Sequence, residues 1–406
     1  MKRFSRSSLT TMAVCLLFIP ALLKAQPRPA HRKKVGVVLS GGGAKGMAHI
    51  GVLKVIEKAG IPIDYVVGTS MGSIIGGLYS IGYSPEQLDS MVRRQDWTFL
   101  LSDKIPRSEQ NLSERDASQK YVFSIPFGKG VKAEVFGGLI RGQNLANLFS
   151  ELTIGYHDSI NFNKLPIPFA CVSENIVNGN EVNFHEGVLA TAMRASMAIP
   201  GVFTPVRLDS MVLVDGGVVN NYPVNVARAM GADLIIGVDV QSELKPAGEL
   251  NSAGAILGQL VNLMGQDLYK KNLKETTTYI KVNVEGYSAA SFTPSAIDTL
   301  IMRGEEAAMA QDSALMALKS QLGLDSTYMP QPIPSYPYSP ERKVYVKEIT
   351  FDGLDEKDKK WLLKRCDLKE NSEISIRRIE EATAILSANL GYSGATYNLP
   401  EAPGGG

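Results

Sequence analysis

One short segment of the chain has the residue pattern of a catalytic nucleophile. Gly68-Thr-Ser-Met-Gly72 follows an apolar run and precedes a stretch rich in small residues. A serine between two such glycines is typical of a strained strand-to-helix turn, which exposes the hydroxyl at the head of a helix. An ordinary structural turn is the alternative. The pattern favours Ser70 as the nucleophile of an acyl-transfer reaction.

A second glycine-rich turn lies shortly before it. Gly41-Gly-Gly-Ala-Lys-Gly46 separates an apolar run from a stretch with helical periodicity. Backbone amides that converge before a helix N-terminus favour a negative charge, either a phosphate or an oxyanion. The glycines also fit G-x-G-x-x-G with Asp64 about 20 residues on, so a dinucleotide fold is an alternative. The glycine-rich turn is not a Walker loop, because Met47 stands at the position where that loop requires a lysine.

A serine hydroxyl needs a base, and the sequence offers two candidates. Asp215 follows the apolar run 211–214 and precedes Gly216 and Gly217, where the backbone can approach another loop closely. His49, in the helix after the glycine loop, is the rival base. A carboxylate with a pKa near 4 is a weak base, so it must contact the serine directly. An aspartate that merely stabilises a turn is the alternative.

These segments are expected to meet at one edge of a sheet. Apolar runs that end at turn residues indicate strands over 34–40, 64–67, 168–173, 211–214 and 234–239. Helical periodicity indicates helices over 47–59, 73–80 and 224–230, and Ser84 to Gln87 has the pattern of a capping box. The alternation predicts an α/β domain with a parallel sheet and helices on both faces, from residue 34 to about 325. We place Ser70, the glycine loop and Asp215 at the strand C-termini.

The N-terminus has the features of a secretory signal peptide over residues 1–25. Basic residues precede an apolar run over 12–23, and Ala25 offers a cleavage position. An uncleaved anchor is the alternative. Removal leaves Cys171 and Cys366, which we interpret as thiols. The four histidines, His31, His49, His157 and His185, form no cluster with cysteine at zinc-ligand spacing, so the sequence gives no reason to expect a metal site.

The C-terminal part has a different pattern. Residues 326–343 contain five prolines and predict an extended linker. Beyond it we predict a strand over 344–351, helices over 355–365 and 375–389, and a weaker strand over 392–399. This is a β-α-α-β unit of about 60 residues, near the lower limit for independent folding.

Taken together, the motifs resemble the patatin-like phospholipases. Ser40-Gly-Gly-Gly-Ala-Lys-Gly-Met-Ala-His-Ile-Gly-Val-Leu53, Gly68-Thr-Ser-Met-Gly72 and Asp215-Gly-Gly217 look like the three signatures of that family. Residues 194–203 and 221–224 also match its pattern. The resemblance spans about residues 34–325, and the combination is far more specific than any single motif.

The resemblance implies a fold and a mechanism. The fold would be a three-layer sandwich with a central, mostly parallel sheet. Ser70 would attack an ester carbonyl, and Asp215 would take its proton as the other half of a Ser-Asp dyad. The amides of Gly42, Gly43 and Ala44 would hold the oxyanion. Water would then cleave the acyl-enzyme and release a fatty acid, with no metal or cofactor.

The tail is similar to a POTRA module without its usual final strand. In a bacterial subgroup a patatin domain is followed by POTRA and an outer-membrane barrel. We therefore expect either a fragment of such a protein or a relative without a barrel. Either arrangement implies export to the periplasm, the outer membrane or the surface of a Gram-negative bacterium.

The expected partners are a phospholipid or another membrane-derived lipid and the membrane surface. A formal net charge of +1 gives no reason to expect a nucleic-acid partner. Trp97-Thr-Phe-Leu-Leu101 is either an interfacial lip or part of the core. Three other functions stay open: a non-catalytic interaction protein, a nucleotide binder and an esterase for small soluble esters.

Overall fold

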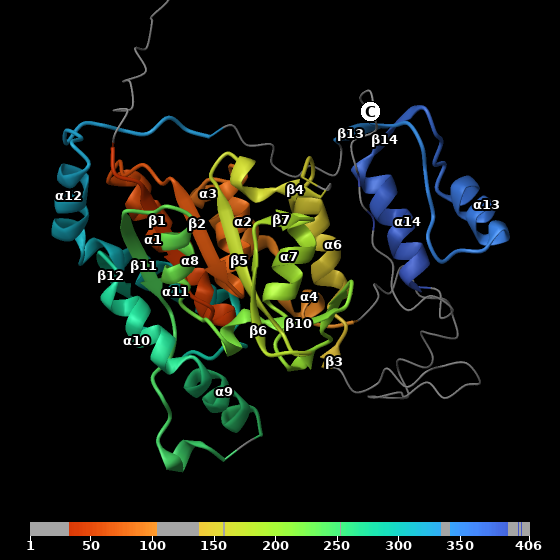
Figure 1. Cartoon of the computed structure of the whole chain (residues 1–406). Coiled ribbons are helices and arrows are strands. Elements are labelled where there is room, and N and C mark those ends of the chain that lie inside the picture. Colours follow the sequence, from red (N-terminus) through yellow and green to blue (C-terminus); the bar gives the residue numbers. More distant parts are fainter. Residues whose placement is uncertain are drawn as a thin grey trace, which may run out of the picture. The chain divides into compact units, whose positions relative to one another are not determined.

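The computed structural model describes residues 32–103, 138–156, 159–251, 253–333 and 342–388, with Tyr397 and Leu399. Figure 1 shows its larger part as a sheet flanked by helices. The predicted signal peptide, residues 334–341 of the proline-rich linker and most of the predicted final strand lie outside the described residues.

The central sheet is mixed. Its strand order is β12-β11-β1-β2-β5-β10-β9, and β6 also pairs with β5. The strands from β12 to β5 are parallel, whereas β10 and β6 run antiparallel to β5 and β9 runs antiparallel to β10. The strands are β1 (Val35–Leu39), β2 (Tyr65–Thr69), β5 (Phe169–Asn175), β6 (Asn180–Phe184), β9 (Val206–Leu208), β10 (Met211–Asp215), β11 (Leu234–Asp239) and β12 (Thr278–Lys281). All five predicted strands are therefore confirmed.

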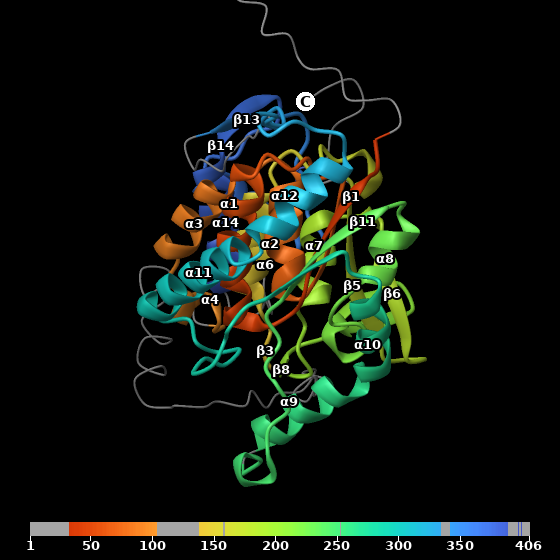
Figure 2. The ribbon, with the colours of Figure 1, turned by 90° about the vertical axis from the view of Figure 1, so that its left-hand side faces the viewer.

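Hydrophobic layers cover both faces of this sheet. Along β1, Val37 and Leu39 belong to the larger core and Val38 to the smaller one, because neighbouring side chains of a strand point to opposite faces. Residues of α1 (Ala48–Lys58), α2 (Met71–Ser80), α3 (Pro85–Arg94), α6 (Gln143–Leu152), α7 (Leu189–Ser196), α11 (Pro294–Met309) and α12 (Asp312–Gln321) join the larger core. Residues of α8 (Val224–Ala229) join the smaller core, and Tyr269 of α10 (Gln266–Lys274) packs against it. The predicted three layers are confirmed (Figure 2).

A local sequence signal accounts for the start of α3. The Ser84 hydroxyl accepts from the Gln87 amide and the Gln87 side chain accepts from the Ser84 amide, so the predicted capping box opens α3. The remaining elements are α4 (Trp97–Leu100), α9 (Ala253–Met264), β3 (Gly138–Ile140), β4 (Ile160–Asn161), β7 (Glu186–Gly187), β8 (Gly201–Phe203) and the 3₁₀ turns η1 (Gly43–Met47), η2 (Phe162–Lys164), η3 (Gly216–Val218) and η4 (Ala247–Glu249).

The direction of β10 corrects one prediction. Asp215 was expected at the C-terminal edge of a parallel sheet, but β10 enters from the opposite direction. On one edge of β5, β2 ends with Thr69 opposite Val172, and β10 ends with Asp215 opposite Ser173. The two strands thus meet end to end, with β6 on the other edge of β5. This head-on arrangement brings the residue after β2 next to the last residue of β10.

The C-terminal segment also differs from its prediction. It contains β13 (Lys343–Val346), α13 (Glu356–Arg365), β14 (Ser372–Ser375) and α14 (Ile376–Ala388). The two helices were predicted, but the antiparallel strand β14 between them was not. The order is therefore β-α-β-α within the described residues, and the described part of the predicted final strand, Tyr397 and Leu399, has no regular structure. β14 has only four residues and is followed directly by α14. An alternation this short does not indicate a strand from sequence.

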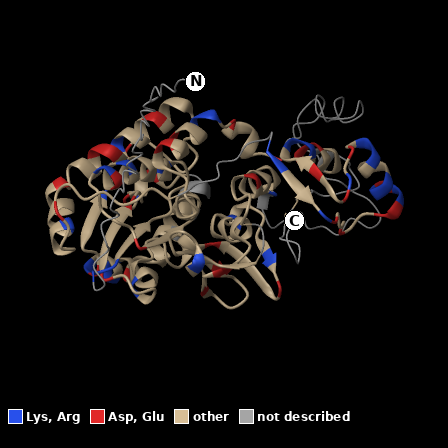
Figure 3. Cartoon of the chain, turned by 90° about the horizontal axis from the view of Figure 1, so that it is seen from above, with Lys and Arg blue, Asp and Glu red and all other residues tan. Residues whose placement is uncertain are grey.

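The cysteines agree with the sequence analysis, and the charged residues are mixed. In the view of Figure 3, acidic and basic residues are interspersed. Cys171 and Cys366 are both free and buried. Within the part of the chain that the structure describes, no helix has the length and apolar character needed to cross a membrane.

Candidate active site

Ser70 lies in a strained turn between β2 and α2. Its φ of 53° and ψ of −124° fall in a region that side chains rarely adopt. The glycines on either side allow the turn, because a Cβ at Gly68 would overlap the Gly72 carbonyl, and one at Gly72 would overlap the Leu39 carbonyl. Strain of this kind is characteristic of a nucleophile at the head of a helix.

Asp215 is in direct contact with this serine. The Ser70 hydroxyl donates to Oδ2 of Asp215 at 2.6 Å, and the Gly217 amide donates to Oδ1 at 2.7 Å. Both side chains are buried, with residue exposures of 5% and 6%. Burial raises the pKa of Asp215 to about 6, although the hydrogen bonds from Ser70 and Gly217 act to lower it. The arrangement places a carboxyl group whose pKa is close to neutrality in direct hydrogen-bond contact with the serine hydroxyl.

Neighbouring residues fix this pair in position. The Ser70 amide donates to the Ser196 hydroxyl, which donates to the Val172 carbonyl. The Thr69 hydroxyl donates to the Asn220 carbonyl. A side chain at Gly216 would overlap the Val172 carbonyl, so this glycine permits the close approach of η3 to β5. The positioning roles of Ser196 and Thr69 were not predicted, although Ser196 lies in the segment 194–203 that contributed to the family resemblance.

The glycine loop lies directly against the serine turn. A Cβ built on Gly41 would lie 3.0 Å from the Ser70 Cβ, and one on Gly46 would overlap the Met71 side chain. The Gly41 amide donates to Oδ1 of Asn221 at 3.1 Å, so it is not available to a substrate. Asn221 belongs to the segment 221–224 that contributed to the family resemblance, but its hydrogen bond to Gly41 was not predicted.

The three predicted oxyanion donors are not equivalent. The Ala44 amide donates to the Ala289 carbonyl at 2.9 Å, so in this structure it is already engaged. The amides of Gly42 and Gly43 donate no backbone hydrogen bond among the described residues. Gly43 lines the same cavity as Ser70. The geometry therefore leaves Gly42 and Gly43 as the available donors.

His49, the rival base, is engaged elsewhere. Its Nε2 lies 2.8 Å from the Ser40 carbonyl oxygen, and the side chain is fully buried. Burial lowers the pKa of His49 to about 4. A neutral imidazole bonded through Nε2 to a backbone carbonyl ties the glycine loop to α1. Its one side-chain hydrogen bond among the described residues is thus to Ser40 and not to Ser70.

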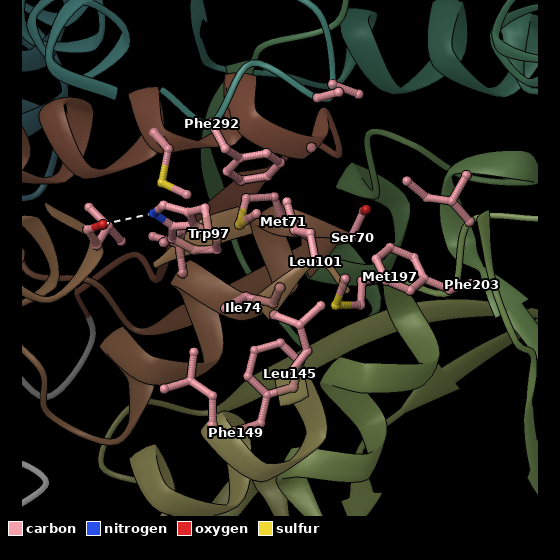
Figure 4. A pocket seen from close by; sticks show the side chains of 18 of the residues that line it. Ser70, Met71, Ile74, Trp97, Leu101, Leu145, Phe149, Met197, Phe203 and Phe292 are labelled. Atoms are coloured by element: carbon pink, nitrogen blue, oxygen red, sulfur yellow. Dashed lines mark hydrogen bonds between the residues drawn. The ribbon is translucent and has the colours of Figure 1, made fainter. Parts of the chain in front are cut away.

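An apolar cavity of about 310 Å³ opens beside Ser70. Ser70 contributes the sole hydroxyl among the described residues that line it, and the only other polar side-chain group is the indole N–H of Trp97. Figure 4 shows its hydroxyl at the cavity wall, near Phe203 and Met197. Trp97 stacks on Phe292 with ring centroids 4.8 Å apart and donates to the Val92 carbonyl. Other lining residues come from α2, α6 and the segment after α7, including Ile74, Leu145, Leu148, Phe149, Ile199 and Val202.

The structure shows how residues 97–101 are buried. Leu100 is buried in the core, whereas Trp97 and Leu101 are half-buried and line the cavity. The segment is therefore part core and part cavity wall.

Within the described part of the chain, no group of three or more His, Cys, Asp or Glu residues has the geometry of a metal site.

The fold and this geometry define an α/β protein with a serine-carboxylate pair at a strained turn. Residues 37–228 match the family model described as patatin-like phospholipase, and they contain the glycine loop, Ser70 and Asp215. The family model and the relatives below support a patatin-like phospholipase domain in this part of the chain.

Curated relatives share this part of the chain. Lysophospholipase NTE1 from Candida albicans is 31% identical over 221 residues, which are 53% of this chain and 14% of that protein. An NTE family protein from Mycobacterium bovis is 29% identical over 230 residues, covering 56% and 55%. Patatin-like phospholipase domain-containing protein 6 from Mus musculus is 32% identical over 211 residues, covering 52% and 14%. The matches thus span about half of the bacterial relative and a seventh of the other two.

Solved structures give weaker matches. VipD from Legionella pneumophila aligns with a TM-score of 0.38 and 15% identity over 71% of this chain and 67% of that one. Human GIVD cytosolic phospholipase A2 aligns with a TM-score of 0.37 and 13% identity over 72% and 60%.

Proposed function

We propose that the protein hydrolyses carboxylic esters of lipids, with Ser70 as nucleophile and Asp215 as general base. The observation that carries the proposal is the position of the Ser70 hydroxyl. It donates to a buried carboxylate and at the same time borders an otherwise apolar cavity. A hydrolase for polar substrates has no use for such a cavity, whereas a fatty acyl chain is stabilised in it by about 0.8 kcal/mol per buried CH₂.

The reaction begins with the contact between Ser70 and Asp215. Oδ2 of Asp215 takes the hydroxyl proton while Oγ of Ser70 bonds to the ester carbonyl carbon. The proton then passes to the leaving alkoxide, and the acyl group stays on Ser70. Water, deprotonated by the same carboxylate, attacks the acyl-enzyme and releases the fatty acid with Ser70 restored. A pKa of about 6 lets Asp215 act in both directions near neutral pH.

The charge that develops on the carbonyl oxygen requires hydrogen-bond donors. We assign this role to the amides of Gly42 and Gly43, because neither donates a backbone hydrogen bond among the described residues and Gly43 lines the cavity beside Ser70. Donors of this kind are typically worth 10²–10³ in kcat each. Ala44 becomes a third donor only when its bond to Ala289 opens.

The substrate class we propose is a phospholipid or lysophospholipid. The names of the relatives from Candida albicans and Mus musculus, a lysophospholipase and a phospholipase-domain protein, support this class. We also propose that the protein is exported through residues 1–25 and acts at a membrane surface of a Gram-negative bacterium. A POTRA-like role for residues 344–406 is part of the same proposal.

The experiment is fatty-acid release from phospholipid vesicles and from lysophospholipid, with EDTA present. It compares the native chain with Ser70→Ala and with His49→Ala. We expect release to vanish in Ser70→Ala and to persist in His49→Ala, provided that both variants fold. Absence of release from any lipid or short-chain ester by the folded native protein would refute the proposal. Equal loss in His49→Ala, with an intact fold, would refute the dyad.

A further inference from the structure

Helix α9 has an apolar face that no described residue covers. Its sequence, Ala-Gly-Ala-Ile-Leu-Gly-Gln-Leu-Val-Asn-Leu-Met, contains no charged residue. Ile256, Leu260, Leu263 and Met264 are exposed by 47%, 52%, 47% and 65%. These positions recur at i, i+4, i+7 and i+8, which places them on one face of the helix. Contiguous exposed apolar side chains on one helix mark an interaction surface.

This helix lies near the candidate active site. Its Gln259 side chain donates to and accepts from the backbone of Lys245, which anchors the preceding loop to it. α9 packs against η3, the turn that directly follows Asp215. Figures 1 and 2 both show α9 standing away from the sheet.

The next helix adds positive charge beside that face. α10 is fixed to the domain because the Asn272 side chain donates to the Tyr222 carbonyl at 2.7 Å and the Tyr269 hydroxyl donates to Asp239 at 2.8 Å. Its three lysines, Lys270, Lys271 and Lys274, are exposed. The ion pair of Lys270 with Asp267, at 3.9 Å, joins two solvated side chains and contributes little.

We propose that α9 inserts its apolar face into the surface of an anionic phospholipid bilayer, with the lysines of α10 against the head groups. An uncharged apolar face followed by a basic segment has the charge pattern of an interfacial helix. The proposal rests on the proposed function, since an acyl chain must pass from a bilayer to the cavity beside Ser70. Since α9 contacts η3, the turn that directly follows Asp215, a docked α9 would lie near the proposed site.

The test measures binding of the full chain to vesicles of phosphatidylglycerol and phosphatidylcholine. All proteins carry Ser70→Ala, so the vesicles stay intact. Leu260→Asp with Leu263→Asp is compared with a matched control, Met302→Asp with Met309→Asp on α11, whose side chains are exposed by 50% and 54%. Both pairs exchange two exposed apolar residues for two charges.

We expect the α9 pair to weaken vesicle binding about tenfold or more, whereas the α11 pair binds like the parent. Hydrolysis of a soluble short-chain ester, measured with Ser70 restored, should be unchanged in both. Equal binding by all three proteins, or no vesicle binding by the parent, would overturn the proposal. So would a parent that self-associates through this face without binding vesicles, which would assign the face to a second copy. Vesicle binding without any ester hydrolysis by the native chain would refute the proposed function alone.

Discussion

Replacing Asp215 with asparagine should abolish activity and stabilise the fold at the same time. Burial raises the pKa of Asp215 from its ordinary 3.8 to about 6, so the ionised carboxylate is disfavoured in the folded state. That change in pKa corresponds to ~3 kcal/mol at pH 8. Asparagine is neutral and of the same shape, and its side-chain oxygen can still accept from Gly217. We therefore expect Asp215→Asn to raise the free energy of unfolding by ~2–3 kcal/mol at pH 8.

The sign of the pH dependence makes this prediction specific. Because the folded pKa is the higher one, the folded wild type takes up its proton first as the pH falls. The stability lost through ionisation is recovered between pH 6 and pH 4, so the advantage of Asp215→Asn should shrink to below ~1 kcal/mol at pH 4. Urea unfolding of both proteins at pH 8, 6 and 4, followed by tryptophan fluorescence and circular dichroism, measures it.

Two results would refute this reasoning. A variant less stable than the wild type at pH 8 would mean that the carboxylate stabilises the fold as a paired charge. A stabilisation that stays the same from pH 8 to pH 4 would mean that ionisation of Asp215 is not its cause. Activity that survives Asp215→Asn would separate the aspartate from catalysis, whatever its effect on stability.

Three further predictions concern the pH profile, the glycine loop and the cavity. Because Asp215 must be ionised to accept a proton, log kcat/KM on a soluble ester should rise with pH up to about 6 and level off above it; a profile without this limb between pH 4 and 8 would contradict the assignment. Gly43→Ala should lower kcat on a soluble ester by about tenfold or more, since Gly43 has φ +57° and its Cβ would overlap Ala289. Gly286→Ala is the control, at φ +84° with open space around it, and equal losses in both variants would assign the effect to φ alone. Leu145→Trp, which fills the cavity, should reduce hydrolysis of long-chain esters far more than of short-chain ones; an unchanged ratio of the two rates would show that acyl chains bind elsewhere.

Local sequence patterns were sufficient to predict the parts of the site that depend on short-range geometry. Ser70, its flanking glycines and the strand before it were predicted because a turn of this type requires those residues at that spacing. The Ser84 capping box and the strand before Asp215 were predicted for the same reason.

Features that depend on pairing between distant segments were not predictable in this way. Nothing in residues 211–215 indicates that β10 runs antiparallel to β5, yet this direction brings Asp215 to Ser70. The cavity draws residues from α2, α6 and the segment around Phe292, so no single stretch encodes it. The engagement of Ala44 by Ala289 joins residues about 245 positions apart in the chain. The sequence around His49 was compatible with a role as catalytic base. Only the burial of this side chain and its hydrogen bond to the Ser40 carbonyl argue against that role.

The central claim is that Ser70 is a nucleophile activated by Asp215 beside an acyl-binding cavity. A long-chain alkyl fluorophosphonate tests it most directly, because it phosphonylates an activated serine and its alkyl chain requires the cavity. Intact-mass and peptide mass spectrometry of the native chain should show one adduct, on Ser70. Ser70→Ala should give no adduct, and Asp215→Asn should react far more slowly while staying folded. Labelling of another residue, or equal labelling in Asp215→Asn, would contradict the account.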